Sequence, residues 1–272
     1  MFWGIVLYIV IVLVAFYLVN KHNKNKKKEN SEKTENQNKA NSIHQDLKQY
    51  HIYVKNGDMY INQGEYDKAI HEQNKAIELM PNLSDAYWSR INAYYCKSEY
   101  QRAISDCNIV LKKEPDSARI YHNRGLLYQT MGDNEKALDD YKTAIKLDPN
   151  NADYYGDLCV IYIIMGNREK ALESVNTSIR LDPNVAQAYC NRGQLHLEMN
   201  KFVLAIADYD KAIELNPDMP IWYYNRGLCH CNIEDFSKAI ADFEVAIKLD
   251  PSDSDFHNSL AKATESEKMI KE

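Results

Sequence analysis

Proline returns along this chain at a fixed interval of 34 residues. The prolines that keep this register are Pro81, Pro115, Pro149, Pro183, Pro217 and Pro251. Loops in an ordinary globular domain differ in length, so a strict period of this size indicates one supersecondary unit that is stacked repeatedly. The chain is therefore predicted to form a solenoid rather than a domain around a single core.

Each 34-residue block carries the same residue types at the same places when its proline is counted as the thirty-second residue. The fourth place is always tyrosine, the twentieth is always alanine, and the eighth is glycine in four of the six blocks. Apolar and small residues recur at helical spacing over the second to fourteenth and the eighteenth to thirty-first places. A glycine or a polar residue separates these stretches, and the proline ends the second one. We therefore predict two antiparallel helices in every block.

These blocks resemble tetratricopeptide repeats. One block meets the signature of that family with Tyr121, Gly125, Tyr128, Ala137, Tyr141, Ala144 and Pro149. The resemblance implies an all-α fold, a right-handed superhelical solenoid of six helical hairpins over residues 50–253. Residues 254–272 are expected to form a polar C-terminal capping helix. Repeats one to six are residues 50–83, 84–117, 118–151, 152–185, 186–219 and 220–253. Repeat four departs most from the signature, with Cys159, Val175 and Ser178 at three of its places.

The N-terminal segment is strongly apolar. Residues 2–19 carry no charge and are mostly Leu, Ile, Val and Phe, and a cluster of lysines follows from Lys21 to Lys28. A helix of this length spans about 27 Å, close to the thickness of a bilayer's hydrocarbon core. A cleaved secretory signal would instead carry positive charge before the apolar run and small residues after it. We therefore predict a transmembrane anchor at 1–19, a flexible basic polar linker at 20–49, and a single-pass protein whose repeats face the cytoplasm.

Motifs that would carry enzymatic chemistry are missing from the sequence. It contains no glycine-rich phosphate loop, nucleophile elbow or H-E-x-x-H helix. Cys229, His230 and Cys231 are consecutive, so on a helix they point about 100° apart and do not converge on one metal ion. The repeats have more acidic than basic residues, which disfavours binding to a phosphate backbone. We expect a protein that is not an enzyme, with no cofactor or metal and neither nucleic acid nor a small-molecule substrate as ligand.

Arginine and aspartate vary together between the repeats. The seventh place is arginine and the twenty-third is aspartate in repeats two, three, five and six, whereas repeat four has Leu158 and Ser174. The pairs are Arg90 with Asp106, Arg124 with Asp140, Arg192 with Asp208 and Arg226 with Asp242. Because a ligand-binding arginine would not need an accompanying aspartate, we predict structural ion pairs between the two helices of one hairpin.

The resemblance also implies where a partner binds. In this family the first helices line a concave groove, which is faced by their second, fifth, sixth, ninth, twelfth and thirteenth places. We predict a partner site between repeats two and four, with Trp88 as its main anchor and Arg119 as a donor to a peptide carboxylate or carbonyl. Exposed apolar groups there indicate a partner surface, unless neighbouring helices cover them. The full predicted site is Trp88, Asn92, Arg119, His122, Asn123, Leu126, Val160 and Ile164.

Three functions are compatible with these observations. The leading hypothesis is a membrane-anchored interaction scaffold that binds a peptide segment or a subunit of another protein in the groove. The second is an import or assembly receptor for membrane or exported proteins. The third, the regulatory arm of an enzyme, is disfavoured because no catalytic domain follows the repeats in this sequence.

Overall fold

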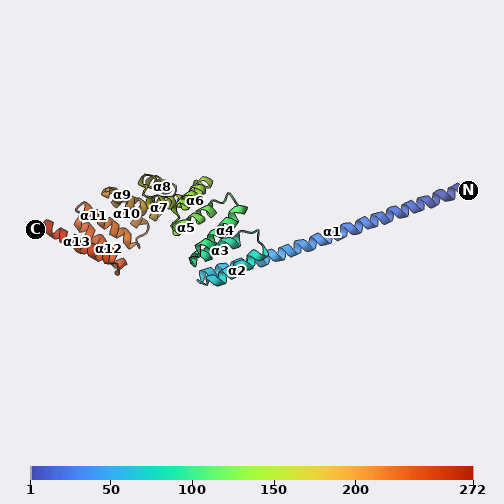
Figure 1. The fold of residues 1–272 in the computed structure, drawn as a ribbon, viewed down its shortest axis with the longest axis horizontal. Helices are drawn as coiled ribbons and strands as arrows, with labels where there is room; N and C mark the ends of the chain where they lie inside the picture. Colours follow the sequence, from blue (N-terminus) through green and yellow to red (C-terminus); the bar gives the residue numbers. More distant parts are fainter. Residues whose placement is uncertain (1, 272) are drawn as a thin grey trace. The chain divides into compact units, whose positions relative to one another are not determined.

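A computed structural model describes the backbone of residues 2–271 and the side chains of residues 21, 22, 24–27, 33 and 36–270. All regular secondary structure in this part of the chain is α-helical, as predicted (Figure 1). The chain divides into two compact units, residues 1–98 and residues 99–272. Each unit is described by itself.

The first unit contains three helices, α1 (Phe2–Asn62), α2 (Tyr66–Leu79) and α3 (Asp85–Cys96). The C-terminal part of α1 forms the first helix of repeat one and packs against α2. Tyr50 is fully buried there, and its hydroxyl accepts a hydrogen bond from the backbone N–H of Ala86 at 3.1 Å. This bond joins the start of repeat one to the start of α3.

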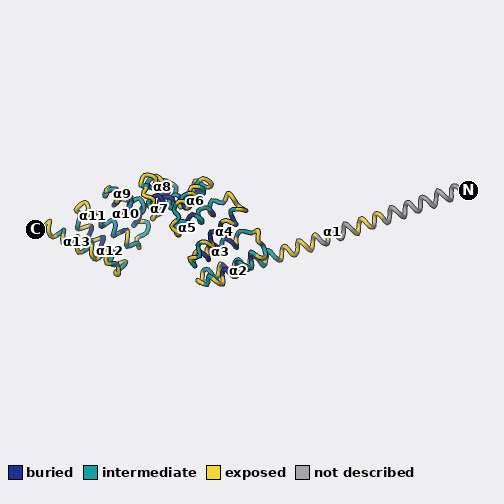
Figure 2. Tube along the Cα trace, in the orientation of Figure 1, coloured by how far each residue is buried: buried dark blue, intermediate teal, exposed yellow. Residues whose placement is uncertain are grey.

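Residues 20–49 differ from the flexible coil that the sequence predicted, because α1 runs through them without a break (Figure 1). The described side chains up to residue 45 are exposed, so tertiary packing does not hold this stretch helical (Figure 2). Two properties of the sequence account for the helix. Lysine, glutamate and glutamine lose little rotamer freedom in a helix, and the packed end of α1 supplies the costly nucleus.

The predicted localisation, a single-pass membrane protein with its repeats facing the cytoplasm, is contradicted. Among the residues that the structure describes, no helix combines the length and the apolar character that a bilayer crossing requires. Lysine, asparagine and glutamine dominate the described side chains of α1 before repeat one, and polar and charged groups of this kind are unfavourable in hydrocarbon. The predicted span, residues 2–19, lies outside the residues whose side chains are described.

The second unit begins with α4 (Tyr100–Lys113) and continues as four helical hairpins and a final helix. Its helices are α5 (Ala118–Thr130), α6 (Asn134–Leu147), α7 (Ala152–Ile164), α8 (Arg168–Leu181), α9 (Ala186–Glu198), α10 (Phe202–Leu215), α11 (Pro220–Asn232), α12 (Phe236–Leu249) and α13 (Ser254–Lys271). The hairpins are α5 with α6, α7 with α8, α9 with α10 and α11 with α12, and successive hairpins pack against each other. These bounds confirm the helices predicted from the 34-residue period.

The turn inside each repeat uses a left-handed backbone at its fifteenth place. Glycine occupies this place in repeats one, three and four, and the φ of Gly132 is +80°. The other three repeats place Ser98, Asn200 and Glu234 there, with φ values of 59°, 56° and 61°. A residue with a side chain is strained in this region, so glycine is the favoured choice.

Close approach of the two helices explains the glycine at the eighth place. A Cβ added to Gly125 would lie 2.7 Å from Cε1 of Tyr141, which is fully buried on the second helix of the same hairpin. Gly227 faces Phe243 in the same way, at 2.6 Å. The buried residues therefore lie along the helix faces inside each hairpin (Figure 2).

Helix α13 covers the end of the stack. It packs against α12 and α11, with Phe256 and Ala263 buried. Most of its other side chains are polar, as the prediction of a polar capping helix requires.

Candidate functional site

The arginines that recur at the seventh place of the repeats form forks that join the two helices of a hairpin. Arg124 on α5 donates from Nε to Oδ2 of Asp140 at 2.8 Å and from Nη2 to Oδ1 at 2.7 Å. Arg226 and Asp242 repeat this geometry at 3.0 and 2.6 Å. Arg192 donates twice to Oδ1 of Asp208, at 3.0 and 2.7 Å. The prediction of ion pairs inside one hairpin is confirmed for repeats three, five and six.

A third nitrogen of each arginine reaches the preceding repeat. Nη1 of Arg124 donates to Oδ1 of Asn108 at 2.6 Å, and Nη1 of Arg226 donates to Oδ1 of Asp210 at 2.6 Å. Arg192 binds Asn176, and Arg90 in the first unit binds Asn74. All four acceptors occupy the twenty-fifth place of the preceding repeat. Because the guanidinium groups form their hydrogen bonds with residues of the repeats, these arginines belong to the scaffold rather than to a ligand site.

Repeat four lacks the fork, and the structure shows what replaces it. Leu158 is buried at the place of the arginine, and the hydroxyl of Ser174 donates to the carbonyl of Lys170 instead. A hollow of about 230 Å³ remains there, lined in part by Tyr155 and Tyr162. In repeat three the guanidinium group of Arg124 occupies the equivalent space. Its carbon lies 5.4 Å from the ring centre of Tyr121 and 5.9 Å from that of Tyr128.

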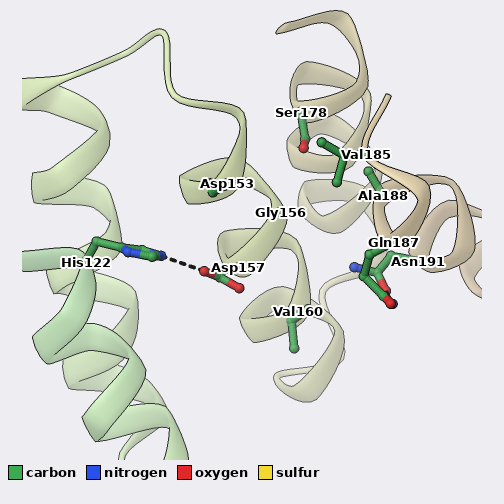
Figure 3. Close-up of a pocket in the computed structure, with 10 residues that line it drawn as sticks. All are labelled: His122, Asp153, Gly156, Asp157, Val160, Ser178, Val185, Gln187, Ala188 and Asn191. Atoms are coloured by element: carbon green, nitrogen blue, oxygen red, sulfur yellow. Dashed lines mark hydrogen bonds and ion pairs between the residues drawn. The ribbon is translucent and has the colours of Figure 1, made fainter. Parts of the chain in front are cut away.

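A larger hollow lies on the groove-facing side of repeat four, between α7 and α9. Its volume is about 420 Å³. Figure 3 shows His122 reaching from α5 towards Asp157 on α7, with Gln187 and Asn191 on α9 at the other side. The remaining lining residues are Asp153, Gly156, Val160, Ser178, Val185 and Ala188.

Two small residues leave this space empty. At the junction before it, the ring of His122 lies 4.7 Å from that of Tyr154, and at the last junction Tyr224 lies 5.0 Å from Phe256. These rings come from the fifth place of one repeat and the third place of the next. The same two places around the hollow are occupied by Gly156 and Ala188.

The other junctions that lie within one unit keep a large side chain in this position. Trp222, which is 3% exposed, stands opposite Cys190 in the second unit. In the first unit Val54 and Ala86 are both small, but Tyr50 fills the space and bonds to the backbone of Ala86. Repeat four has Ala152 at the place of Tyr50, so it offers no substitute.

Acidic and amide groups surround the hollow. Oδ2 of Asp157 lies 2.6 Å from Nε2 of His122, and the side-chain amide of Gln187 donates to Oδ1 of Asn191 at 2.9 Å. Asp153 is exposed one turn before Asp157, on the same face of α7. Deeper in the hollow, the hydroxyl of Ser178 donates to the carbonyl of Ala152 at 2.9 Å and is therefore satisfied.

The residues of the predicted partner site divide between the two units. Trp88, which is half-buried, and Asn92, which is exposed, lie on α3 in the first unit. In the second unit, His122 and Val160 line the hollow. The exposed side chains are Arg119 on α5 and Ile164 on α7, whose side chain is 53% exposed. Leu126 packs against the core of repeats three to five, and Asn123 is half-buried on α5.

Sequence reasoning placed Asn191 on the groove face but missed four other polar or small residues that line the hollow. The four are Asp153, Gly156, Asp157 and Gln187, which occupy groove-facing places of repeats four and five. The signal that would have found them was the pair of small residues, Gly156 and Ala188, at places that hold a ring elsewhere.

The buried cysteines and histidines belong to the core. Burial raises the pKa of the Cys107, Cys159 and Cys229 thiols to about 12, so these groups are protonated at neutral pH. Burial also lowers the pKa of His230, whose Nδ1 lies 4.0 Å from Oδ2 of Asp235. Within the described part of the chain, no group of histidine, cysteine and acidic side chains is arranged to hold a metal ion.

Family models match most of the repeat region. A model of the tetratricopeptide repeat matches residues 118–151, 186–219 and 220–253, and a second tetratricopeptide repeat model matches residues 152–185. A model described as TPR repeat matches residues 57–96. Together these segments cover more than half of the chain. A comparison with the curated proteins gives no match.

Solved structures with similar folds include several repeat proteins. A structure of pilF from Pseudomonas aeruginosa has a TM-score of 0.71 at 19% identity and covers 80% of this chain and 99% of its own. YrrB, described as a TPR protein with an unusual peptide-binding site, has a TM-score of 0.56 at 21% identity, with coverages of 71% and 97%.

The APC/C hetero-tetramer Cut9–Hcn1 has a TM-score of 0.68 at 14% identity and matches 79% of this chain. The present chain spans only 42% of the length of that relative. At these identities, the three likenesses show a shared fold.

Proposed function

Because the chain belongs to the tetratricopeptide repeat family, we propose that it is a non-enzymatic interaction scaffold. It binds a peptide segment, or a subunit of another protein, along the groove-facing side of its first helices. The observation that carries this proposal is the hollow of about 420 Å³ at the groove-facing places of repeats four and five. Its volume lies within the range of ordinary ligand pockets.

The chemistry of this face suits an extended peptide. Amide side chains both donate and accept hydrogen bonds, as a peptide backbone does, and Asn123, Gln187 and Asn191 present such groups on α5 and α9. Val160 and the exposed Ile164 offer apolar surface beside them. Apolar anchors with surrounding polar groups are the usual composition of a peptide site.

The predicted contacts of Trp88, Asn92 and Arg119 remain part of the proposal. Trp88 would bury a large aromatic surface against the partner, and Arg119 would donate paired hydrogen bonds to a carboxylate or carbonyl. Trp88→Ala is then expected to weaken binding of the partner by about 1–3 kcal/mol and to leave the helical content unchanged.

Site-specific photo-crosslinking tests this function. A photoreactive residue replaces Ile164 or Gln187 on the groove-facing side, and in the control it replaces the exposed Lys142 on α6. We expect one partner to be crosslinked from both groove positions and not from the control position. Crosslinks that form at Lys142 while Ile164 and Gln187 give none contradict binding at this face. Crosslinks to many unrelated exported or membrane proteins support the alternative function, an import or assembly receptor.

A further inference from the structure

We propose that the hollow between α7 and α9 binds an arginine side chain of the partner peptide. This inference rests on the proposed function and adds the chemistry that the site recognises. It is carried by three properties of the hollow, namely its shape, its charge and its walls.

The shape follows from the ring pair that is missing. Neighbouring junctions of the second unit hold flat groups in this position, as His122 and Tyr154 show with ring centres 4.7 Å apart. Gly156 and Ala188 leave the same space open, and a Cβ added to Gly156 would lie 3.7 Å from Oγ of Ser178, an ordinary contact distance. A planar guanidinium group therefore fits where a ring stands elsewhere.

The charge of the hollow is negative. Asp153 and Asp157 lie four residues apart on α7, which places both carboxylates on one face of the helix. His122 engages Oδ2 of Asp157, and no lysine or arginine is among the residues that line the hollow. In the described part of the chain, no side chain pairs with the Asp153 carboxylate. An added cation would relieve the repulsion between the two acids.

The walls suit the rest of the side chain. Val160 and Val185 are half-buried and offer apolar surface to the methylene groups of a long side chain. The side-chain oxygens of Gln187 and Asn191 lie on α9, across the hollow from the acids (Figure 3). Arginine has five donors in a fixed plane and can address both sides, whereas lysine presents a single point charge.

Peptide selection on the full-length chain tests the inference. A library of random peptides is selected on the immobilised protein, and the affinity of each selected peptide is measured again with its arginine replaced by lysine or by citrulline, a neutral isostere. We expect arginine to be enriched at one position and the citrulline versions to bind about tenfold more weakly or worse. Lysine versions should fall between the two.

Three variants locate the arginine. Asp153→Asn and Asp157→Asn should each weaken the arginine peptides and leave the citrulline peptides nearly unchanged. The control is Asp255→Asn, at the equivalent exposed place of α13, which should have no effect. The double variant Gly156→His with Ala188→Tyr copies the ring pair of the preceding junction, so it should keep its helical content and lose the preference for arginine.

The results separate this inference from the proposed function. Selected peptides without a basic residue, or equal affinity for the arginine and citrulline versions, overturn the arginine site and leave the scaffold function in place. The same conclusion follows if the refilled double variant keeps its preference for arginine. A selection that yields no binding peptide overturns the scaffold function itself.

Discussion

Arg124 on α5 clasps Asp140 on α6 through two hydrogen bonds, of 2.8 and 2.7 Å. Only 7% of the Asp140 side chain is exposed, so its carboxylate is shielded from solvent and accepts its hydrogen bonds from the guanidinium group of Arg124. The same arginine also reaches Asn108 in the preceding repeat. One side chain therefore stabilises both a hairpin and its junction with the preceding repeat.

A double-mutant cycle on Arg124→Ala and Asp140→Ala measures this pair. We expect a coupling free energy of about 1–3 kcal/mol in chemical denaturation, because the bonds are charge-assisted and largely shielded from solvent. The control cycle uses Arg168 and Glu198, which lie 3.2 Å apart with 57% and 31% of their side chains exposed. That exposed pair should give less than about 1 kcal/mol. Additive effects at Arg124 and Asp140 would contradict the clasp.

Grafting the fork into repeat four tests whether its parts are sufficient. Leu158→Arg alone places a charge in the core without an acceptor and should lower the free energy of unfolding by about 3 kcal/mol. Adding Ser174→Asp and Lys142→Asn supplies the two acceptors that the other repeats have, and most of this loss should be recovered. Denaturant melts compare the free energy of unfolding of the single variant with that of the triple variant. A triple variant that is no more stable than Leu158→Arg speaks against transferable forks.

Two glycine substitutions should change stability in opposite directions. Gly125→Ala places a Cβ 2.7 Å from the ring of the buried Tyr141 and should cost about 1–3 kcal/mol through overpacking. Gly156→Ala meets only Oγ of Ser178 at 3.7 Å, and it should stabilise α7 by about 0.5–1 kcal/mol because alanine restricts the unfolded chain. Thermal melts of the two variants provide the comparison. Equal effects would show that the hollow at Gly156 is closed.

The buried thiols predict a loss of stability at alkaline pH. Cys107, Cys159 and Cys229 have pKa values of about 12 in the folded chain, whereas an unfolded cysteine has a pKa of about 8.5. The folded state therefore holds more protons above that pH, and the stability that the thiols contribute is complete below pH 8.5 and declines as the pH rises towards 12. Denaturant melts between about pH 7 and 9.5 measure how the free energy of unfolding changes with pH. The three buried thiols make this slope negative.

Thiol labelling at neutral pH provides an independent readout for the same cysteines. The exposed Cys96 should react first, and the three buried thiols should react only as fast as the protein opens. Rapid labelling of Cys159 in the folded protein would contradict its burial.

Much of the fold follows from the sequence because one register governs the whole repeat region. The period predicted the bounds of α5 and α6 to within one residue, and the joint variation of Arg124 and Asp140 predicted their contact. The bond to Asn108 was missed because it crosses a repeat boundary and its acceptor is either an amide or a carboxylate. Both amides and carboxylates accept the same hydrogen bond, so no single residue type marks the place.

The hollow was harder to predict than the fold. It arises from side chains that are absent, at Gly156 and Ala188, and these residues belong to two different repeats. The sequence pointed to exposed apolar groups such as Leu126, which the structure packs against the core. The apolar N-terminal run likewise led to a localisation that is contradicted, since no helix among the described residues is long and apolar enough to cross a membrane.

The junction between repeats three and four is fastened differently from the later ones. Lys142 and Leu158 stand where the later junctions have an acceptor and an arginine, and the bond of 2.6 Å between His122 and Asp157 joins the two repeats on the other face. Under a load applied along the array, this junction lacks the arginine that is bonded to both repeats at each of the next two junctions. When the second unit is pulled from its ends, we expect α6 and α7 to separate first. Repeats four to six should then be released together before they unfold one at a time.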